Sequence, residues 1–181
     1  MKVSFELGPK DLRYFRDRLR HVRDRYGPKD ESRVLRKAAR LVKKAEAAEP
    51  PEFVLSRIEK LDQLTLMLVD EDWRLEGRDR ARILNALAYF AEPDDLIPDR
   101  VPGVGYLDDA IMVELVVQEL RHEIEAYEDF CESRKRSAIA RDVQKRETRR
   151  RALQARMRRR TRSDREKLKS RSPGSSRLRL W

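Results

Sequence analysis

The chain has 181 residues and a net charge of +10, but the charge is distributed unevenly. Residues 1–133 contain 23 basic and 29 acidic residues, whereas residues 134–181 contain 20 basic and 4 acidic residues. This length allows one globular domain with a hydrophobic core, and the uneven charge excludes a uniformly basic protein in favour of an acidic body with a basic tail. The single Cys131 excludes an internal disulfide, and because no signal peptide or run of about 20 apolar residues is visible, we expect a cytoplasmic protein.

Four helices are predicted before the middle of the chain, because apolar residues recur there every three or four positions. The first covers residues 10–26, the second follows the N-cap candidate Ser32 and ends at Pro50, and the third and fourth cover residues 53–68 and 78–90. The loop before the fourth helix contains Trp73, which we expect to fold back onto the body. The predicted buried faces of the last three helices contain Val34, Leu35, Ala38, Leu41, Val42, Ala45, Phe53, Ile58, Leu61, Leu64, Leu68, Ile83, Leu84, Leu87 and Phe90.

A long fifth helix is predicted from Asp108 to Arg136. No segment alternates apolar and polar residues over the length of a strand, so no sheet is expected. The predicted fold class is all-α: a bundle of about five helices in which a turn rich in proline, glycine and aspartate closes a helical hairpin. We expect residues 1–77 to form an N-terminal helical region and residues 78–133 to form the hairpin, packed together as one body.

The turn, DDLIPDRVPGVGYLDD at residues 94–109, is the least helix-like stretch of the chain. Asp95, Asp99 and Asp108 have short side chains that accept backbone N–H groups in turns and at helix starts. Asp108 and Asp109 also open the fifth helix, where negative charge meets the positive end of the helix dipole. The alternative is that these carboxylates bind a hard cation such as Mg²⁺ or Ca²⁺, although their spacing does not match an EF-hand. We expect a structural turn.

The segment ALAYFAEPDDLIPDRVPGVGYLDDA, residues 86–110, resembles the signature of the YkvA-like family, a bacterial domain family of unknown function. Polar residues at Glu92, Asp94 and Arg100 depart from the pattern. The resemblance covers about residues 78–120 and implies a helical hairpin closed by this turn, with no established activity. The residues that carry the resemblance are Tyr89, Pro93, Asp95, Leu96, Ile97, Pro98, Asp99, Pro102, Gly105, Asp108 and Asp109.

A second candidate for metal chemistry is the sequence ELRH at residues 119–122. Glu119 and His122 are three positions apart on a helix, a spacing that di-iron helical bundles use for their ligands. A complete site needs a second such pair, which a homodimer could supply; the alternative is that the pair lies on a solvated surface.

The sequence offers no activated nucleophile and no phosphate-binding glycine loop. We therefore expect a non-enzymatic binding or scaffold protein without a cofactor, with a second copy or another protein as a possible partner of the body.

The tail, residues 134–181, has too few apolar residues to fold as a domain, which predicts a solvated extension of the fifth helix or a helix that forms on a polyanion. Arginine dominates it, and the planar guanidinium binds phosphate bidentately, so we expect salt-dependent nucleic-acid binding without sequence preference. The alternatives are a solvated helix, an intrachain partner for the acidic body, or attraction to an anionic membrane surface. The candidate phosphate-binding residues are Arg149, Arg150, Arg151, Arg156, Arg158, Arg159, Arg160 and Arg162.

Overall fold

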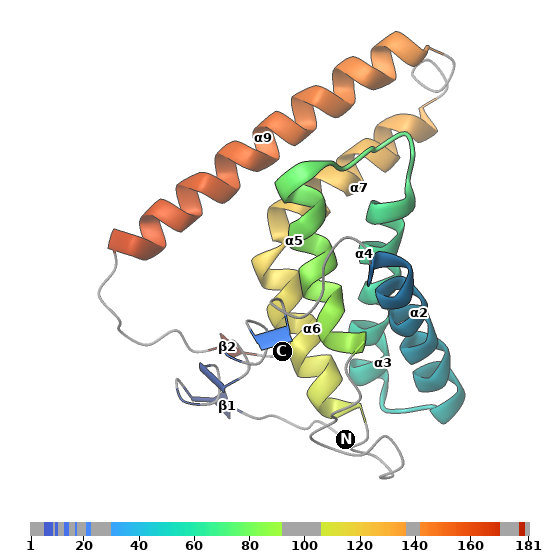
Figure 1. The fold of residues 1–181 in the computed structure, drawn as a ribbon, viewed down its shortest axis with the longest axis vertical. Helices are drawn as coiled ribbons and strands as arrows, with labels where there is room; N and C mark the ends of the chain where they lie inside the picture. Colours follow the sequence, from blue (N-terminus) through green and yellow to red (C-terminus); the bar gives the residue numbers. More distant parts are fainter. Residues whose placement is uncertain are drawn as a thin grey trace.

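The structure is a computed structural model that describes residues 6–8, 10, 13–14, 17, 21–22, 30–91, 106–136, 142–170 and 178–179. These residues are helical apart from loops and one pair of very short strands (Figure 1), so the predicted all-α fold class is confirmed. The α-helices are α2 (Glu31–Ala48), α3 (Glu52–Ile58), α4 (Lys60–Val69), α5 (Gly77–Ala88), α6 (Leu107–Glu119), α7 (Arg121–Lys135) and α9 (Val143–Ser170), with a 3₁₀ turn, η2 (Tyr89–Ala91), after α5.

Helix α2 buries the apolar stripe that the sequence predicts and packs it against α4, α5 and η2. Its end is also as predicted: Glu49 adopts the left-handed conformation, with φ of 45°, directly before Pro50. Of the residues expected to be buried in the second to fourth predicted helices, Leu35, Leu41 and Phe53 are only partly buried. The other predicted positions lie in the hydrophobic core.

The third predicted helix is two helices in the structure, α3 and α4, which are interrupted at Glu59, although Glu59 keeps right-handed helical dihedrals with φ of −58° and ψ of −23°. Helix α3 packs mainly against α6, whereas α4 packs against α2 and α5. A continuous stripe of apolar residues does not reveal such an interruption, since both helices bury one face and the spacing is preserved across the junction.

The fifth predicted helix is also divided, at Leu120, where φ is −97° and ψ is 12°. Helix α6 is buried on nearly all sides, including its first turn, and forms the centre of the bundle (Figure 1). Helix α7 buries a narrower face with His122, Ile124, Tyr127 and Phe130. The two segments therefore meet different surroundings, and the turn at Leu120 allows each to align with its own neighbours.

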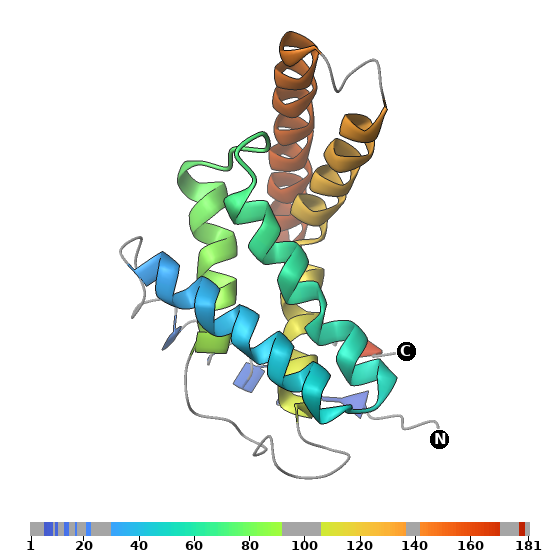
Figure 2. The ribbon, with the colours of Figure 1, turned by 90° about the vertical axis from the view of Figure 1, so that its right-hand side faces the viewer.

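The basic segment forms α9, and its packing corrects the prediction of a solvated tail. Helix α7 ends at Lys135, and α9 runs back alongside α7 as the second arm of a hairpin (Figures 1 and 2). Asp142 caps its start by accepting the Lys145 amide N–H at 3.1 Å. Leu153 and Met157 are 2% and 1% exposed and belong to the common core. Two buried side chains and a set of polar contacts suffice for docking, although they would not stabilise a separate domain.

Two short strands, β1 (Glu6–Leu7) and β2 (Leu178–Arg179), pair antiparallel near the two ends of the chain. The sequence predicts no sheet, and a ladder of two residues per strand is too short for any alternation to appear. In the first predicted helix, residues 10, 13, 14, 17, 21 and 22 are helical, and Val22 is buried. The remainder of residues 10–26 lies outside the described residues.

Candidate functional site: the arginine-rich helix and the acidic surface beneath it

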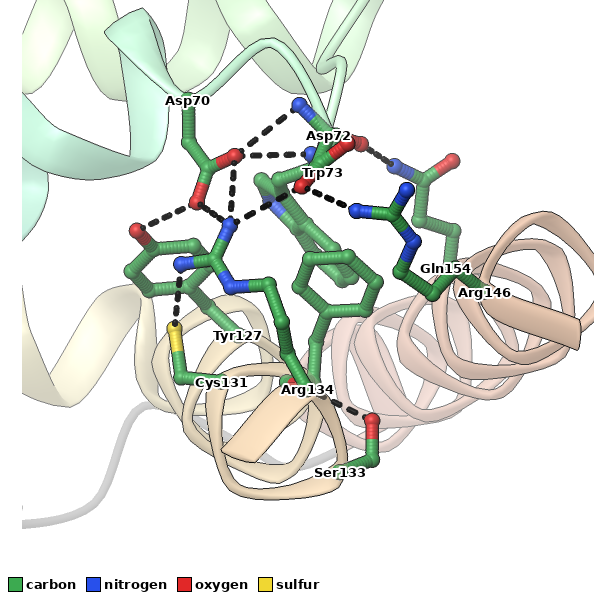
Figure 3. A network of polar contacts seen from close by, with 10 residues as sticks. Asp70, Asp72, Trp73, Tyr127, Cys131, Ser133, Arg134, Arg146 and Gln154 are labelled. Atoms are coloured by element: carbon green, nitrogen blue, oxygen red, sulfur yellow. Dashed lines mark hydrogen bonds and ion pairs between the residues drawn. The ribbon is translucent and has the colours of Figure 1, made fainter. Parts of the chain in front are cut away.

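Trp73 connects the loop after α4 with both helices of the C-terminal hairpin. It is fully buried, and its ring lies 5.6 Å from that of Tyr127 and 5.2 Å from that of Phe130, both on α7. Its backbone carbonyl accepts a hydrogen bond of 2.8 Å from the amide of Gln154 on α9 (Figure 3). The prediction that Trp73 folds back onto the body is confirmed, and the surface it meets includes α9.

Asp70 is the centre of the polar network around this loop (Figure 3). Its carboxylate accepts the backbone N–H groups of Asp72 and Trp73 at 3.0 and 3.1 Å, the Tyr127 hydroxyl at 3.0 Å, and the Arg134 guanidinium at 2.9 Å. Burial, followed by hydrogen bonding to Cys131 and Asp70, raises the pKa of Tyr127. The pKa of Arg134 is also raised, because the Asp70 carboxylate outweighs the opposing effect of burial. This network fixes the loop against α7.

The first turns of α9 are held by the same loop. Arg146 donates to the Asp72 carboxylate at 3.0 Å, and Arg150 donates to the carbonyl of Arg74 at 3.3 Å. Arg150 is 8% exposed and also donates a hydrogen bond to the Glu147 carboxylate. Hydrogen bonding to Arg150, and then to Arg151, lowers the pKa of Glu147 to about 2. The structure therefore places Arg150, one of the predicted phosphate-binding residues, in a packing contact.

Further along α9, the flanking arginines pair with acidic residues of the body. Arg158 donates to Asp79 of α5 and Arg160 to Glu125 of α7, each at 2.6 Å. Arg156 pairs with Asp129 of α7. These contacts match the alternative in which the basic segment is an intrachain partner of the acidic body. Most of these side chains are about half exposed, so each pair contributes little to stability.

Glu123 is a buried carboxylate at the junction of α5, α7 and α9. It is 1% exposed, forms an ion pair with Arg82 of α5, and accepts the Thr161 hydroxyl of α9 at 3.4 Å. Burial raises the pKa of Glu123, and the nearby Arg82 opposes that shift in part. Arg82 also donates to the backbone carbonyl of Glu119 at 2.8 Å, which ties the end of α6 to the same junction.

Glu119 and His122, the predicted metal pair, have different partners in the structure. The Glu119 side chain is 62% exposed and lies 3.7 Å from Arg82. The His122 side chain is 9% exposed, and its Nε2 lies 2.7 Å from the Asp164 carboxylate of α9. Hydrogen bonding to His122, and then to Arg121, lowers the pKa of Asp164. Within the described part of the chain, no group of three or more His, Cys, Asp and Glu side chains is suited to a metal ion.

Asp164 is a contact residue that the sequence analysis does not single out. Its one signal is that it is an acidic residue within a long basic run, at a position that shares the buried face of α9 with Leu153 and Met157. That signal becomes visible only once the helix and its partner are known.

The aspartate-rich turn is described only at its end. Asp95 and Asp99 lie outside the described residues. Asp108 and Asp109 are in the first turn of α6, as predicted, and are 3% and 6% exposed. The start of α6 follows Tyr106, whose φ of 64° is left-handed.

Five arginines of α9 have no acidic partner on the described part of the body. Arg149, Arg159 and Arg165 are exposed and form no ion pair with any residue that the structure describes. Arg151 and Arg162 are 75% and 83% exposed and pair only within α9, with Glu147 and Glu166. Arg165 is one of these exposed arginines, although it is absent from the predicted set of phosphate-binding residues. Helix α9 thus has a docked face, flanks that pair with the body, and a basic solvent face.

One segment of the chain matches a protein-family model. In the described ranges, no helix has the length and apolar character needed to cross a membrane. Comparisons with curated proteins and with solved structures gave no match. The family model described as a protein of unknown function, DUF1232, matches residues 79–115, which include most of α5, η2 and most of α6. This segment is therefore a domain of unknown function of the DUF1232 type, as the resemblance to the YkvA-like domain predicted.

Proposed function

We propose that this protein is a non-enzymatic binding module that holds nucleic acid through the solvent face of α9, by phosphate contacts without sequence preference. The observation that supports the proposal is the division of α9 into faces. Its inner face and flanks contact the body, whereas Arg151, Arg159 and Arg162 project from the opposite side, and Arg149 and Arg165 are exposed along the flanks.

The dimensions of α9 suit a double helix. Its 28 residues extend over about 42 Å, which corresponds to roughly 12 base pairs of duplex. Docking on the body also fixes the helix before binding, so the entropy cost of ordering a flexible tail is avoided. A rigid row of guanidinium groups therefore matches an extended row of phosphates.

Nucleic acid fits this face better than a lipid surface does. An interfacial helix inserts Trp, Phe or Leu side chains between lipids. Among the side chains of α9 that the structure describes, the exposed large apolar side chain is Val143, which is none of these. The face also lacks aromatic residues for base stacking, which favours contacts to the backbone over single-strand readout.

The test uses the full chain, because deleting residues 134–181 would also remove the buried contacts of Leu153, Gln154 and Met157. The variant carries Arg151→Gln, Arg159→Gln and Arg162→Gln, which lie on one side of α9, and glutamine preserves helix propensity. The control removes the same charge at the exposed residues Lys10, Lys60 and Lys135, each changed to glutamine.

Binding to a fluorescent 12-base-pair duplex of random sequence is measured by anisotropy between 50 and 200 mM salt. We expect the α9 variant to lose affinity, and the slope of log K against log salt to become shallower by about 2.7 if three phosphate contacts are lost. The control variant should keep the wild-type slope. Equal slopes for both variants would overturn the proposal, as would tighter binding to vesicles containing anionic phosphatidylserine than to the duplex.

A further inference from the structure

Helix α2 presents a second basic surface, apart from that of α9. Its basic side chains recur at intervals of three and four residues, so they share one face, and all of them are exposed. This face lies opposite the stripe of Val34, Ala38, Val42 and Ala45 that α2 buries. The residues of this surface are Arg33, Arg36, Lys37, Arg40, Lys43 and Lys44.

Four residues of this surface have no acidic partner in the part of the chain that the structure describes. Arg36, Lys37, Arg40 and Lys43 form no ion pair with any residue in the described ranges. The acidic residues of α2 are Glu31, which pairs with Arg80 of α5, and Glu46, which lies outside the basic arc. Like charges four residues apart, such as Arg36 and Arg40, destabilise a helix. A polyanion lying along the face relieves that repulsion.

The surface on α2 is separate from the one on α9. Helix α2 packs on α3, α4, α5 and η2, whereas α9 packs along α7. Both views show α2 and α9 on different sides of the body, with α4 to α7 between them (Figures 1 and 2). A single straight duplex of about 12 base pairs cannot lie along both helices.

We infer that the basic face of α2 is a second phosphate-binding surface, so that one molecule bridges two nucleic-acid segments. The inference rests on the proposed function, because α9 holds the first segment. The basic residues from 33 to 44 extend over about 16 Å, roughly five base pairs of duplex. Among the exposed large apolar side chains of the described residues none belongs to α2, so the face offers no anchor for a lipid bilayer.

The experiment separates bridging from binding. A 12-base-pair duplex is immobilised on beads, and capture of a second, fluorescent duplex is measured with and without protein; anisotropy reports the binding of one duplex. The α2 variant carries Arg36→Gln, Arg40→Gln and Lys43→Gln, and it is compared with the α9 variant, with both sets combined, and with the Lys10, Lys60 and Lys135 control. Far-UV circular dichroism checks that each variant retains the wild-type helix content.

We expect the wild type and the control to capture the second duplex. The α2 variant and the α9 variant should each still bind one duplex, the α9 variant with reduced affinity, but each should lose at least tenfold in capture. The combined variant should lose both binding and capture. Capture by the α2 variant at the wild-type level would overturn the inference, because a dimer bridging through two α9 helices gives that result. Unchanged single-duplex binding by the α9 variant would instead contradict the proposed function. Capture of phosphatidylserine vesicles, but not of duplex, through the α2 residues would overturn the assignment to nucleic acid.

Discussion

Glu123 illustrates at the residue scale how the fold places an ionisable group where its charged form is disfavoured. The carboxylate is buried between α5, α7 and α9, and burial raises its pKa above the ordinary value of 4.5. Arg82 and Thr161 compensate in part, by an ion pair and a hydrogen bond. The group therefore makes stability depend on pH in the direction opposite to that of a carboxylate whose pKa is lowered by folding, such as Asp164.

Replacing Glu123 by glutamine should remove this pH dependence. In the wild type, the folded state holds a proton that the unfolded chain releases above pH 4.5, so the free energy of unfolding falls as pH rises toward the folded pKa. In Glu123→Gln that contribution is absent, and the wild type should lose stability relative to the variant as pH rises above 4.5. Urea denaturation at several pH values between 4 and 8 measures the difference. Glu132→Gln, at a side chain that is 68% exposed, is the control; parallel curves for Glu123→Gln and wild type would contradict the argument.

At the scale of elements, the docking of α9 combines a small apolar contact with many exposed ion pairs. Leu153 and Met157 are buried, and Gln154 bonds the Trp73 carbonyl between them. The pairs on the flanks, such as Arg160 with Glu125, are about half exposed. Burial of apolar surface contributes more per side chain than an exposed ion pair does, so the apolar contact should dominate docking.

Two substitutions on the same helix compare these contributions directly. Leu153→Ala should lower the free energy of unfolding by about 2–5 kcal/mol, the range for truncating a buried leucine. Arg160→Gln should lower it by about 0.2–1 kcal/mol, as for exposed ion pairs. Both are measured by urea denaturation at the same salt concentration. A larger loss in Arg160→Gln than in Leu153→Ala would show that electrostatics, rather than apolar burial, holds α9 in place.

Elements also show where sequence periodicity stops being informative. The breaks at Glu59 and Leu120 interrupt helices that the apolar pattern predicts as continuous. Neither position contains glycine or proline, so no local signal marks the interruption. The break at Leu120 also separates Glu119 from His122, which then make contacts with different helices.

For the whole molecule, the division of charge along the sequence becomes a contact in space. The acidic residues of α5, α7 and the loop after α4 lie beneath the basic helix α9, so part of the tail charge is matched within the chain. The unmatched positive charge lies on the solvent faces of α9 and α2. The molecule is thus a helical body with basic surfaces on different sides (Figure 2).

Because α9 shares the core with Trp73 and α7, the body and the basic helix should unfold in one transition. The test uses Trp181→Phe, which leaves Trp73 as the sole tryptophan. In urea, Trp73 fluorescence and far-UV circular dichroism should give the same midpoint. An earlier loss of helix signal, with Trp73 fluorescence unchanged, would mean that α9 melts independently of the body.

The sequence by itself determined the helical class, the apolar face of α2, the end of that helix before Pro50, and the buried Trp73. It also identified the DUF1232 segment, through the motif around residues 89–109. These features depend on local spacing, on backbone restrictions of proline, and on short-range motifs, all of which a sequence displays directly.

Tertiary structure alone decided which arginines remain available. Arg150 and Arg159 look alike in the sequence, but Arg150 is buried against the loop carbonyl of Arg74 and Arg159 projects into solvent. The partners of His122 and Glu123, and the interruptions at Glu59 and Leu120, depend likewise on residues distant in the chain. Their common cause is that a polar or charged side chain takes its role from the groups that folding brings beside it. Those groups can be distant in the sequence, as Gln154 and Trp73 are, 81 positions apart.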